Sequence, residues 1–232
     1  MVKVTFIGQS CVMLEGEKTS LIIDPYITDN PDITNTTKAG DIDVDYILVT
    51  HGHFDHLGDA IDIAKRTEAT LIAPFELATY CGYQGVKNIH PMHIGGAHRF
   101  SDDLWVKLTI AHHGSAVLDN ESKTIIYTGN PCGFIIELDG KKFYHAGDTG
   151  LFLDMQLIGE NNLDLAMIPI GDNFTMGPED GAKAVELLKP KMVMPMHYIA
   201  WGLIRQDPEY FKSLVGDKAE VKIAKPGDSF EV

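Results

Sequence analysis

The chain has 232 residues, of which 44% are hydrophobic and 22% are charged, and this ordinary globular composition excludes collagen, coiled coil and wholesale disorder. With 19 Lys and Arg against 33 Asp and Glu, the formal net charge is −14. Such a charge opposes non-specific binding to nucleic acid, whose phosphates attract cationic surfaces, although bound divalent metals can add positive charge at a nuclease site.

The cysteine pattern and the apolar runs indicate the cellular compartment in which the protein works. Cys11, Cys81 and Cys132 form an odd, sparse set without Cys-x-x-Cys spacing, which favours a reducing compartment over a disulfide framework. No signal-peptide pattern opens the chain, and no apolar run reaches the ~20 residues that a membrane span needs. We therefore expect a cytoplasmic protein with no membrane partner. Because no low-complexity linker divides the chain, we expect one domain over residues 1–232.

Short β-rich runs dominate the start of the chain. The sequence predicts strands over four ranges, Val2–Ile7, Cys11–Leu14, Leu21–Ile23 and Val44–Val49. The last of these ranges is almost continuously apolar, as is typical of a strand buried on both faces. A short helix is predicted over Asp59–Arg66.

The clearest helical signal begins at Pro178, which suits the first turn of a helix. Glu179 and Asp180 favour the positive N-terminal end of that helix, and Pro190 stops it. The next residues, Lys191–Pro195, are predicted as a further strand.

A faint internal repeat links two distant segments. Cys11–Asp24 and Phe134–Asp148 each consist of a strand, a turn and a second strand that leads to an aspartate. Each unit is followed by an acidic and apolar strand, Asp43–Thr50 in the first case and Asn162–Pro169 in the second. Similar hairpins also arise by chance, but the pattern favours two related halves with a site at their join.

The strongest chemical signal is the sequence HGHFDH at residues 51–56, directly after a predicted strand. It places four potential metal ligands in six residues, and its glycine allows a tight backbone path. The alternative is a solvated polar loop. Crowded imidazoles would repel one another when protonated, and a bound metal removes that penalty. The motif therefore indicates a metal site.

Three later segments each run from a predicted strand into a potential ligand. The first ends at the adjacent His112 and His113, the second at Asp148 and the third at His197. Each segment alone is weak evidence, because a single histidine at a strand end is more often structural. Together with residues 51–56, they deliver the same ligand types to one edge of the fold.

The ordered motifs HGHFDH (51–56), HHG (112–114), AGDTG (146–150) and PMHY (195–198) resemble the metallo-β-lactamase fold superfamily. Within it, they are most similar to the small metal-dependent hydrolases related to ascorbate-lactonase-like proteins. The resemblance runs through essentially the whole chain. It implies an α/β fold, namely a four-layer αββα sandwich of two pseudo-repeated βα halves, with a dinuclear metal site at one edge.

The resemblance also implies a set of metal ligands, carried over motif by motif. One ion would be held by three histidines, His51, His53 and His113. The second ion would be held by Asp55, His56 and His197. Asp148 would bridge the two ions.

At three polar positions the sequence allows two different roles. Neighbouring strand residues point to opposite faces, so only one of His112 and His113 should bind metal. The family spacing matches His113, which leaves His112 beside the site or on the surface. Asp24 either orients a ligand histidine or is a turn residue. Thr175 either faces the site or caps the following helix.

A dinuclear centre of this kind predicts hydrolysis. Two divalent ions ~3.5–4 Å apart would share a bridging water and lower its pKa toward neutrality, which generates a hydroxide nucleophile. Asp55 and Asp148 are the catalytic residues implied, and Asp55 would orient the nucleophile. His112, His145 or a metal-bound water remain open as the general acid. A histidine-rich set with carboxylates and no thiolate suits zinc or manganese, and iron, nickel and cobalt stay open.

We therefore predict a metal-dependent hydrolase of a small ester, lactone or phosphodiester. One alternative is a tRNA-processing-type nuclease of the same superfamily, which the charge of −14 and the lack of a long basic insertion disfavour. The other is a non-catalytic metal-binding module, which loss of ligands would favour. The fold hosts many reactions, so the natural substrate stays open, as does assembly into a homo-oligomer.

Overall fold

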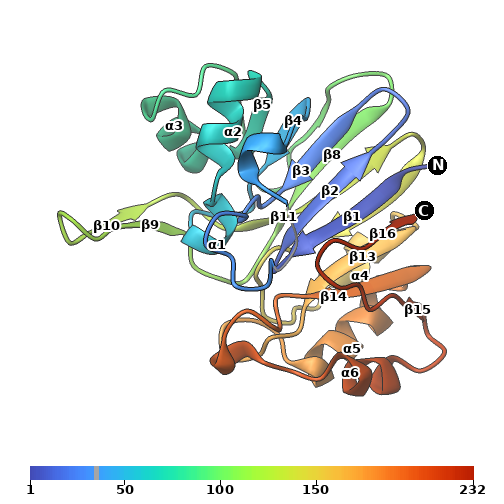
Figure 1. The fold of residues 1–232 in the computed structure, drawn as a ribbon. Coiled ribbons are helices and arrows are strands. Elements are labelled where there is room, and N and C mark those ends of the chain that lie inside the picture. The colour runs from blue at the N-terminus through green and yellow to red at the C-terminus, as the bar shows by residue number, and fades with distance from the viewer. Residues whose placement is uncertain (34–36) are drawn as a thin grey trace.

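The computed structural model describes residues 1–33 and 37–232. Within these residues the strands form two seven-stranded sheets and a separate two-stranded hairpin (Figure 1). The first sheet has the order β16-β1-β2-β3-β4-β5-β6. Its strands are β1 (Lys3–Gly8), β2 (Cys11–Glu15), β3 (Ser20–Ile23), β4 (Tyr46–Leu48), β5 (Thr70–Pro74), β6 (Ile89–Met92) and β16 (Ser229–Glu231).

The second sheet has the order β7-β8-β11-β12-β13-β14-β15. Its strands are β7 (Ala97–Arg99), β8 (Leu104–Ile110), β11 (Cys132–Leu138), β12 (Lys141–His145), β13 (Leu165–Pro169), β14 (Met192–Met196) and β15 (Glu220–Val221). In both sheets the first four strands of the order pair antiparallel, and the remaining pairs are parallel. The two halves thus share one topology, which agrees with the repeat in the sequence.

Helices cover the outer face of each sheet (Figure 1). α2 (Ala60–Thr67) and α3 (Phe75–Tyr83) bury apolar side chains against the first sheet. α4 (Met155–Gly159), α5 (Pro178–Leu188) and α6 (Pro208–Val215) do the same against the second sheet. The other helices among the described residues are short, namely α1 (Phe54–Leu57), η1 (Ala39–Asp41) and η2 (Gly202–Ile204).

The largest apolar cluster lies between the two sheets. It joins Phe6 and Leu14 of the first sheet to Phe134 and Phe143 of the second, all of them fully or almost fully buried. Burial of such side chains contributes roughly 1.5–3 kcal/mol each relative to exposure. Helix, sheet, sheet and helix therefore stack in four layers, which confirms the predicted αββα sandwich.

The predicted elements fall close to the observed ones. The apolar run at 44–49 forms β4 over Tyr46–Leu48 only, and the helix predicted from Asp59 begins one residue later as α2. α5 begins at Pro178 with acidic residues in its first turn, as expected. The hairpin of β9 (Ala116–Asp119) and β10 (Thr124–Tyr127), which projects from the body of the protein (Figure 1), was not predicted. Among the described helices, none is long and apolar enough to cross a membrane.

Candidate active site and metal centre

The topology explains why four chain segments meet at one edge. β8 and β12 are both antiparallel to β11, so they run in the same direction, and β12, β13 and β14 are parallel. The carboxyl ends of β8, β12 and β14 therefore lie at one edge of the second sheet. His113, Asp148 and His197 follow those three ends, and the motif at residues 51–56 follows β4 of the first sheet.

Three histidines form the first group of potential metal ligands. His51 Nε2 lies 3.0 Å from His53 Nδ1, which lies 3.3 Å from His113 Nε2. His51 is buried, whereas His53 and His113 are half-buried. The group therefore has one shielded side and one side that faces the solvent.

The second group consists of Asp55, His56 and His197, all of which are buried. Asp55 Oδ2 lies 3.3 Å from His197 Nε2 and 3.6 Å from His56 Nε2. Asp55 and His56 come from the short helix α1, and His197 follows β14 across the interface between the halves. Both halves of the fold are thus needed for this group.

Asp148 lies between the two groups. Its Oδ1 is 3.3 Å from His56 Nε2, and its Oδ2 is 3.2 Å from His197 Nε2 and 3.6 Å from His113 Nε2. His51, His56 and Asp148 also converge as a third potential ligand group. One buried carboxylate therefore faces ligands from both groups, which is the position that a bridging ligand requires.

The donor set fits divalent metal ions. Two ligand atoms on one tetrahedral ion, each about 2.0–2.1 Å from it, lie about 3.3–3.4 Å apart, and the separations within the cluster centre on this value. His56 Nε2 and Asp148 Oδ1 are both buried and form no hydrogen bond. Because buried polar atoms are normally paired, two such atoms 3.3 Å apart are placed as two ligands of one metal ion would be.

Three cluster histidines are held neutral. Burial lowers the pKa of His51 well below its ordinary value, and the neighbouring His56 lowers it further. Burial also lowers the pKa of His53 and of His113. A neutral imidazole is the form that binds metal, so the first group is ready to do so at neutral pH.

The histidines beside the carboxylates behave in the opposite way. Burial alone would lower the pKa of His197, but Asp148 and Asp55 outweigh it and raise the pKa to about 9. Asp148 and Asp55 likewise raise the pKa of His56 against the effect of burial. The pKa of Asp148, which burial would raise, is held well below its ordinary value by His197 and His56. Without metal, protons on these two histidines balance the buried carboxylates.

The side chain of Asp24 contacts the potential ligand His56, as one of the two alternatives predicts. Its Oδ2 lies 2.7 Å from His56 Nδ1 and accepts a hydrogen bond from Thr50 Oγ1 at 2.7 Å, while its Oδ1 accepts from the Thr50 backbone nitrogen at 2.8 Å. Thr50 Oγ1 also lies 3.0 Å from His51 Nδ1. Carboxylates behind ligand histidines fix the ring orientation in metal sites.

Gln9 contacts the second group and was not predicted as a site residue. Gln9 Nε2 donates to Asp55 Oδ2 at 3.1 Å, and its backbone oxygen accepts from the His197 nitrogen at 3.0 Å. Gln9, Asp24 and His197 all have left-handed backbones, with φ of 55°, 47° and 57°. Such conformations cost of order 1–3 kcal/mol each and cluster at functional sites. The only sequence signal for Gln9 was its position at a strand end.

The remaining polar candidates lie outside the cluster. His112 is exposed, and its ring packs against Phe152 with centroids 5.1 Å apart. His145 is buried, with Nε2 2.9 Å from the Ser10 oxygen and Nδ1 accepting from the Gly147 nitrogen at 3.2 Å. Both of its ring nitrogens therefore have hydrogen-bond partners within the protein. Thr175 Oγ1 bonds the Met176 oxygen and does not cap α5.

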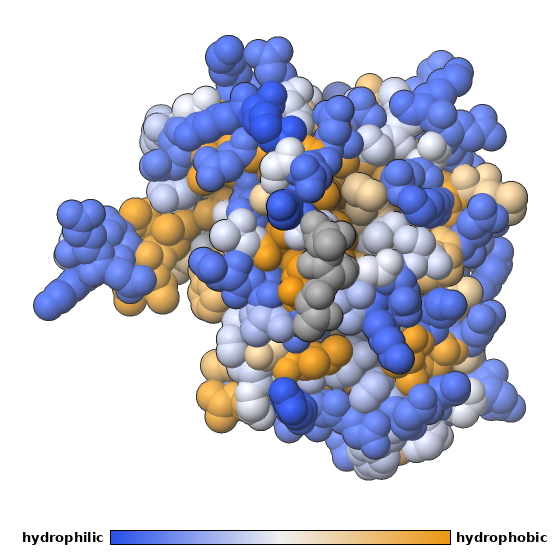
Figure 2. All heavy atoms as spheres, in the orientation of Figure 1, coloured by the Kyte–Doolittle hydropathy of each residue, from blue (hydrophilic) through white to orange (hydrophobic). Residues whose placement is uncertain are grey.

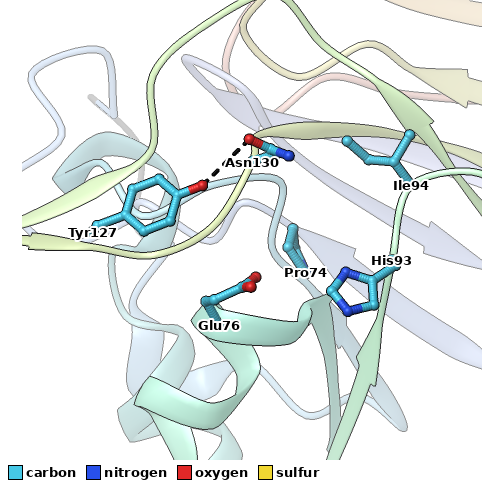
Figure 3. A pocket seen from close by; sticks show the side chains of 6 residues that line it. All are labelled: Pro74, Glu76, His93, Ile94, Tyr127 and Asn130. Carbon is cyan, nitrogen blue, oxygen red and sulfur yellow. Dashed lines mark hydrogen bonds between the residues drawn. The ribbon is translucent and has the colours of Figure 1, made fainter.

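A cavity of about 700 Å³ opens over the cluster and is lined by His53, Asp55, His113, Asp148 and His197, among others. Its size is within the range of small-molecule sites. A smaller cavity of about 260 Å³ lies beside the end of β10, where Glu76, His93 and Asn130 point inward (Figure 3). None of the potential metal ligands lines the smaller cavity, so the larger cavity is the candidate active site.

Comparisons with known proteins agree with this geometry. The model of the beta-lactamase superfamily domain matches residues 19–198. The chain is 53% identical to proteins named UPF0173 metal-dependent hydrolase from Pelotomaculum thermopropionicum and Geobacillus sp., over 99% of this chain and 100% of each relative. Among solved structures, Igni18, a metallo hydrolase from Ignicoccus hospitalis, superposes with a TM-score of 0.88 at 37% identity, over 100% of this chain and 99% of that chain. The chain therefore belongs to the beta-lactamase superfamily and, within it, to the UPF0173 family of metal-dependent hydrolases.

Proposed function

We propose that the protein is a hydrolase with two divalent metal ions. Three histidines hold the first ion, namely His51, His53 and His113. The second ion is held by Asp55, His56 and His197. The observation that supports a dinuclear centre is the position of Asp148, whose two carboxylate oxygens face ligands from both groups.

The residues of the chain prepare the site for hydrolysis. When bound, the two ions lower the pKa of a shared water toward neutrality and stabilise the negative charge that develops on the substrate. Asp55 Oδ2 accepts a hydrogen bond from Gln9 Nε2, which holds the carboxylate that would orient the attacking water. Asp24 holds His56 in place. We propose zinc or manganese as the metal, because the donor set contains imidazoles and carboxylates and no thiolate.

We further propose that residues 1–232 act as one domain on a small-molecule substrate. The ligand set draws on both halves of the fold, so neither half carries a complete second group. The charge of −14 opposes an extended nucleic-acid footprint.

The test is the substitution Asp148→Asn, which keeps the shape of the side chain and removes its charge. We expect the metal content, measured by inductively coupled plasma mass spectrometry, to fall from two ions per chain to one or none. Hydrolysis should fall by more than about 100-fold. The assay uses zinc- or manganese-loaded protein on a carboxylate ester, a sugar lactone, a phosphodiester and a phosphomonoester.

The matched control is Asp154→Asn, which changes an exposed aspartate that makes no capping bond with its side chain. This control should keep both metals and full activity. Two ions and unchanged turnover in Asp148→Asn would contradict the dinuclear assignment.

A further inference from the structure

The walls of the cavity over the potential metal ligands are more apolar than its floor. The floor is formed by histidines and aspartates, whereas the walls include Phe54, Leu118, Phe174, Trp201 and Leu203. Most of the lining surface is thus contributed by apolar side chains. Contiguous apolar surface of this kind on a soluble protein marks a binding site.

One wall is an aromatic cluster beside the metal ligands. Phe54 lies between His53 and Asp55 in the chain, yet 63% of its side chain is exposed. Its ring packs edge-on against Tyr26 and Trp201, with centroids 5.8 Å apart in both cases. Tyr26 and Trp201 stack at 6.4 Å. Phe54 and Trp201 line the cavity, whereas Tyr26 is buried, so the first two rings form an apolar face to which a substrate group can bind.

The remaining apolar lining comes from the projecting hairpin, the turn at Phe174 and the short helix η2. Leu118 of β9, Phe174 and Leu203 line the cavity, and 57%, 52% and 70% of their side chains are exposed. Figure 2 shows apolar side chains along the hairpin behind a hydrophilic tip. Exposed side chains of this size lose their contact with water when an apolar ligand covers them, which contributes about 25 cal/mol per Å².

The residues described as lining the cavity offer no cationic lysine or arginine side chain to an anion. Among the described residues that line it, none is lysine or arginine, and Asp55 and Asp148 add negative charge. Sites that recognise phosphate or carboxylate groups normally present arginine or lysine to them. An additional negative charge on the substrate would therefore be unpaired in this cavity.

We infer that the site takes an uncharged ester or lactone with an apolar aryl or alkyl group, held between the aromatic face and Leu118. The inference rests on the proposed hydrolase function. In the reaction, the oxygen of water bonds to the carbonyl carbon, and the bond from that carbon to the alcohol oxygen breaks. Of the two protons of the water, one goes to the alcohol oxygen and the other is released, so the products are a carboxylate, an alcohol and a proton.

The first arm of the test compares 4-nitrophenyl esters on the metal-loaded protein. From acetate to butanoate to hexanoate, kcat/KM should rise by up to about fourfold per methylene. The pentanoate should exceed the hemisuccinate, which has a similar length and a negative charge, by at least tenfold. Bis(4-nitrophenyl) phosphate should be slower still. Equal rates for the pentanoate and the hemisuccinate would overturn the inference and leave the proposed hydrolase function standing.

The second arm uses variants of the walls. Phe54→Ala and Leu118→Ser should raise KM for the hexanoate more than for the acetate, which flattens the dependence on chain length. The matched control is Leu157→Ser on α4, since 61% of Leu157 is exposed and it does not line the cavity. An unchanged chain-length dependence in both wall variants would contradict the assignment of the walls.

The third arm measures binding without turnover. The chain has two tryptophans, Trp201 in the cavity wall and Trp105 on β8. The uncharged 4-nitrophenyl hexyl ether should quench the fluorescence saturably, and this quenching should survive Trp105→Phe but disappear in Trp201→Phe. If no ester turns over with two metals bound, the proposed function fails, and this titration decides the inference: saturable quenching at Trp201 supports an apolar site, and its absence overturns it.

Discussion

His56 connects two aspartates that occupy equivalent places in the two halves of the fold. Its Nδ1 lies 2.7 Å from Asp24 Oδ2, and its Nε2 lies 3.3 Å from Asp148 Oδ1. Asp24 follows β3, and Asp148 follows the equivalent strand β12. The same position in the repeat thus supplies an orienting carboxylate in one half and a proposed bridging ligand in the other.

We predict that Asp24→Asn weakens metal binding without removing a ligand. The amide keeps the size of the side chain but is a poorer acceptor for the His56 ring and for Thr50, so His56 becomes less basic and less well oriented. Loss of such a partner typically costs 10–100-fold in metal affinity. Competition with a chromogenic chelator measures the effect.

The matched control for this prediction is Asp29→Asn. Asp29 also has a left-handed backbone, with φ of 62° against 47° at Asp24, but its side chain is exposed. Asparagine tolerates that conformation as well as aspartate does. Equal affinities in the two variants would show that Asp24 has no part in metal binding.

The elements that carry the ligands were predictable, and the walls of the cavity were not. The proposed ligands at 51–56, His113, Asp148 and His197 all follow buried strands, and a strand that leads into a potential ligand is a local signal in the sequence. The walls depend on contacts between distant segments, such as Trp201 against Phe54. The hairpin β9–β10 pairs Leu118 with Ile125 while both side chains remain exposed, so it lacks the alternating burial pattern that indicates a strand.

The loop between β4 and α1 requires its glycine because of close packing. A Cβ at Gly52 would overlap Thr128 Oγ1 and lie 3.2 Å from the backbone carbonyl carbon of Ala116. The Gly52 nitrogen donates to Ser115 Oγ at 3.1 Å, and that oxygen lies 2.7 Å from Thr128 Oγ1. His51 and His53 flank this contact, so a shift of the loop moves two proposed ligands.

We predict that Gly52→Ala destabilises the protein by about 1–3 kcal/mol, as overpacking does, and lowers its metal content. Thr128→Ala removes the overlapping hydroxyl, so the double variant should lose less free energy of unfolding than the sum of the two single variants. Urea unfolding of the four proteins gives this coupling directly. Strictly additive losses would mean that the two residues do not meet as the structure describes.

At the scale of the whole molecule, backbone hydrogen bonds join the two halves beside the proposed metal ligands. The Cys132 nitrogen donates to the Thr50 oxygen at 3.1 Å, and the His197 nitrogen donates to the Gln9 oxygen at 3.0 Å. Each bond joins one half of the fold to the other. The buried charges of the cluster lie at the same junction, so their protonation affects the stability of the entire sandwich.

The metal-free protein should therefore lose stability as the pH rises from about 6.5 to about 9. The pKa of His197 is raised to about 9 in the fold by Asp148 and Asp55, against the effect of burial, and is about 6.5 in the unfolded chain. The stabilising proton is fully bound below the unfolded value and is lost as the pH rises through the folded value. His56 acts in the same direction. The loss from His197 alone is of order 3 kcal/mol.

The metal-loaded protein should show the opposite trend over the same range. Metal ions replace the protons on His197 and His56, so the affinity of the protein for metal rises with pH. The free energy of unfolding that bound metal contributes rises as well. Urea unfolding at pH 6.5, 7.5 and 9, with chelated and with metal-loaded protein, tests both trends. Metal-free His197→Gln should have a flatter pH profile than the metal-free parent. If the chelated parent is equally stable at all three pH values, the imidazolium of His197 does not hold the two carboxylates together in the absence of metal.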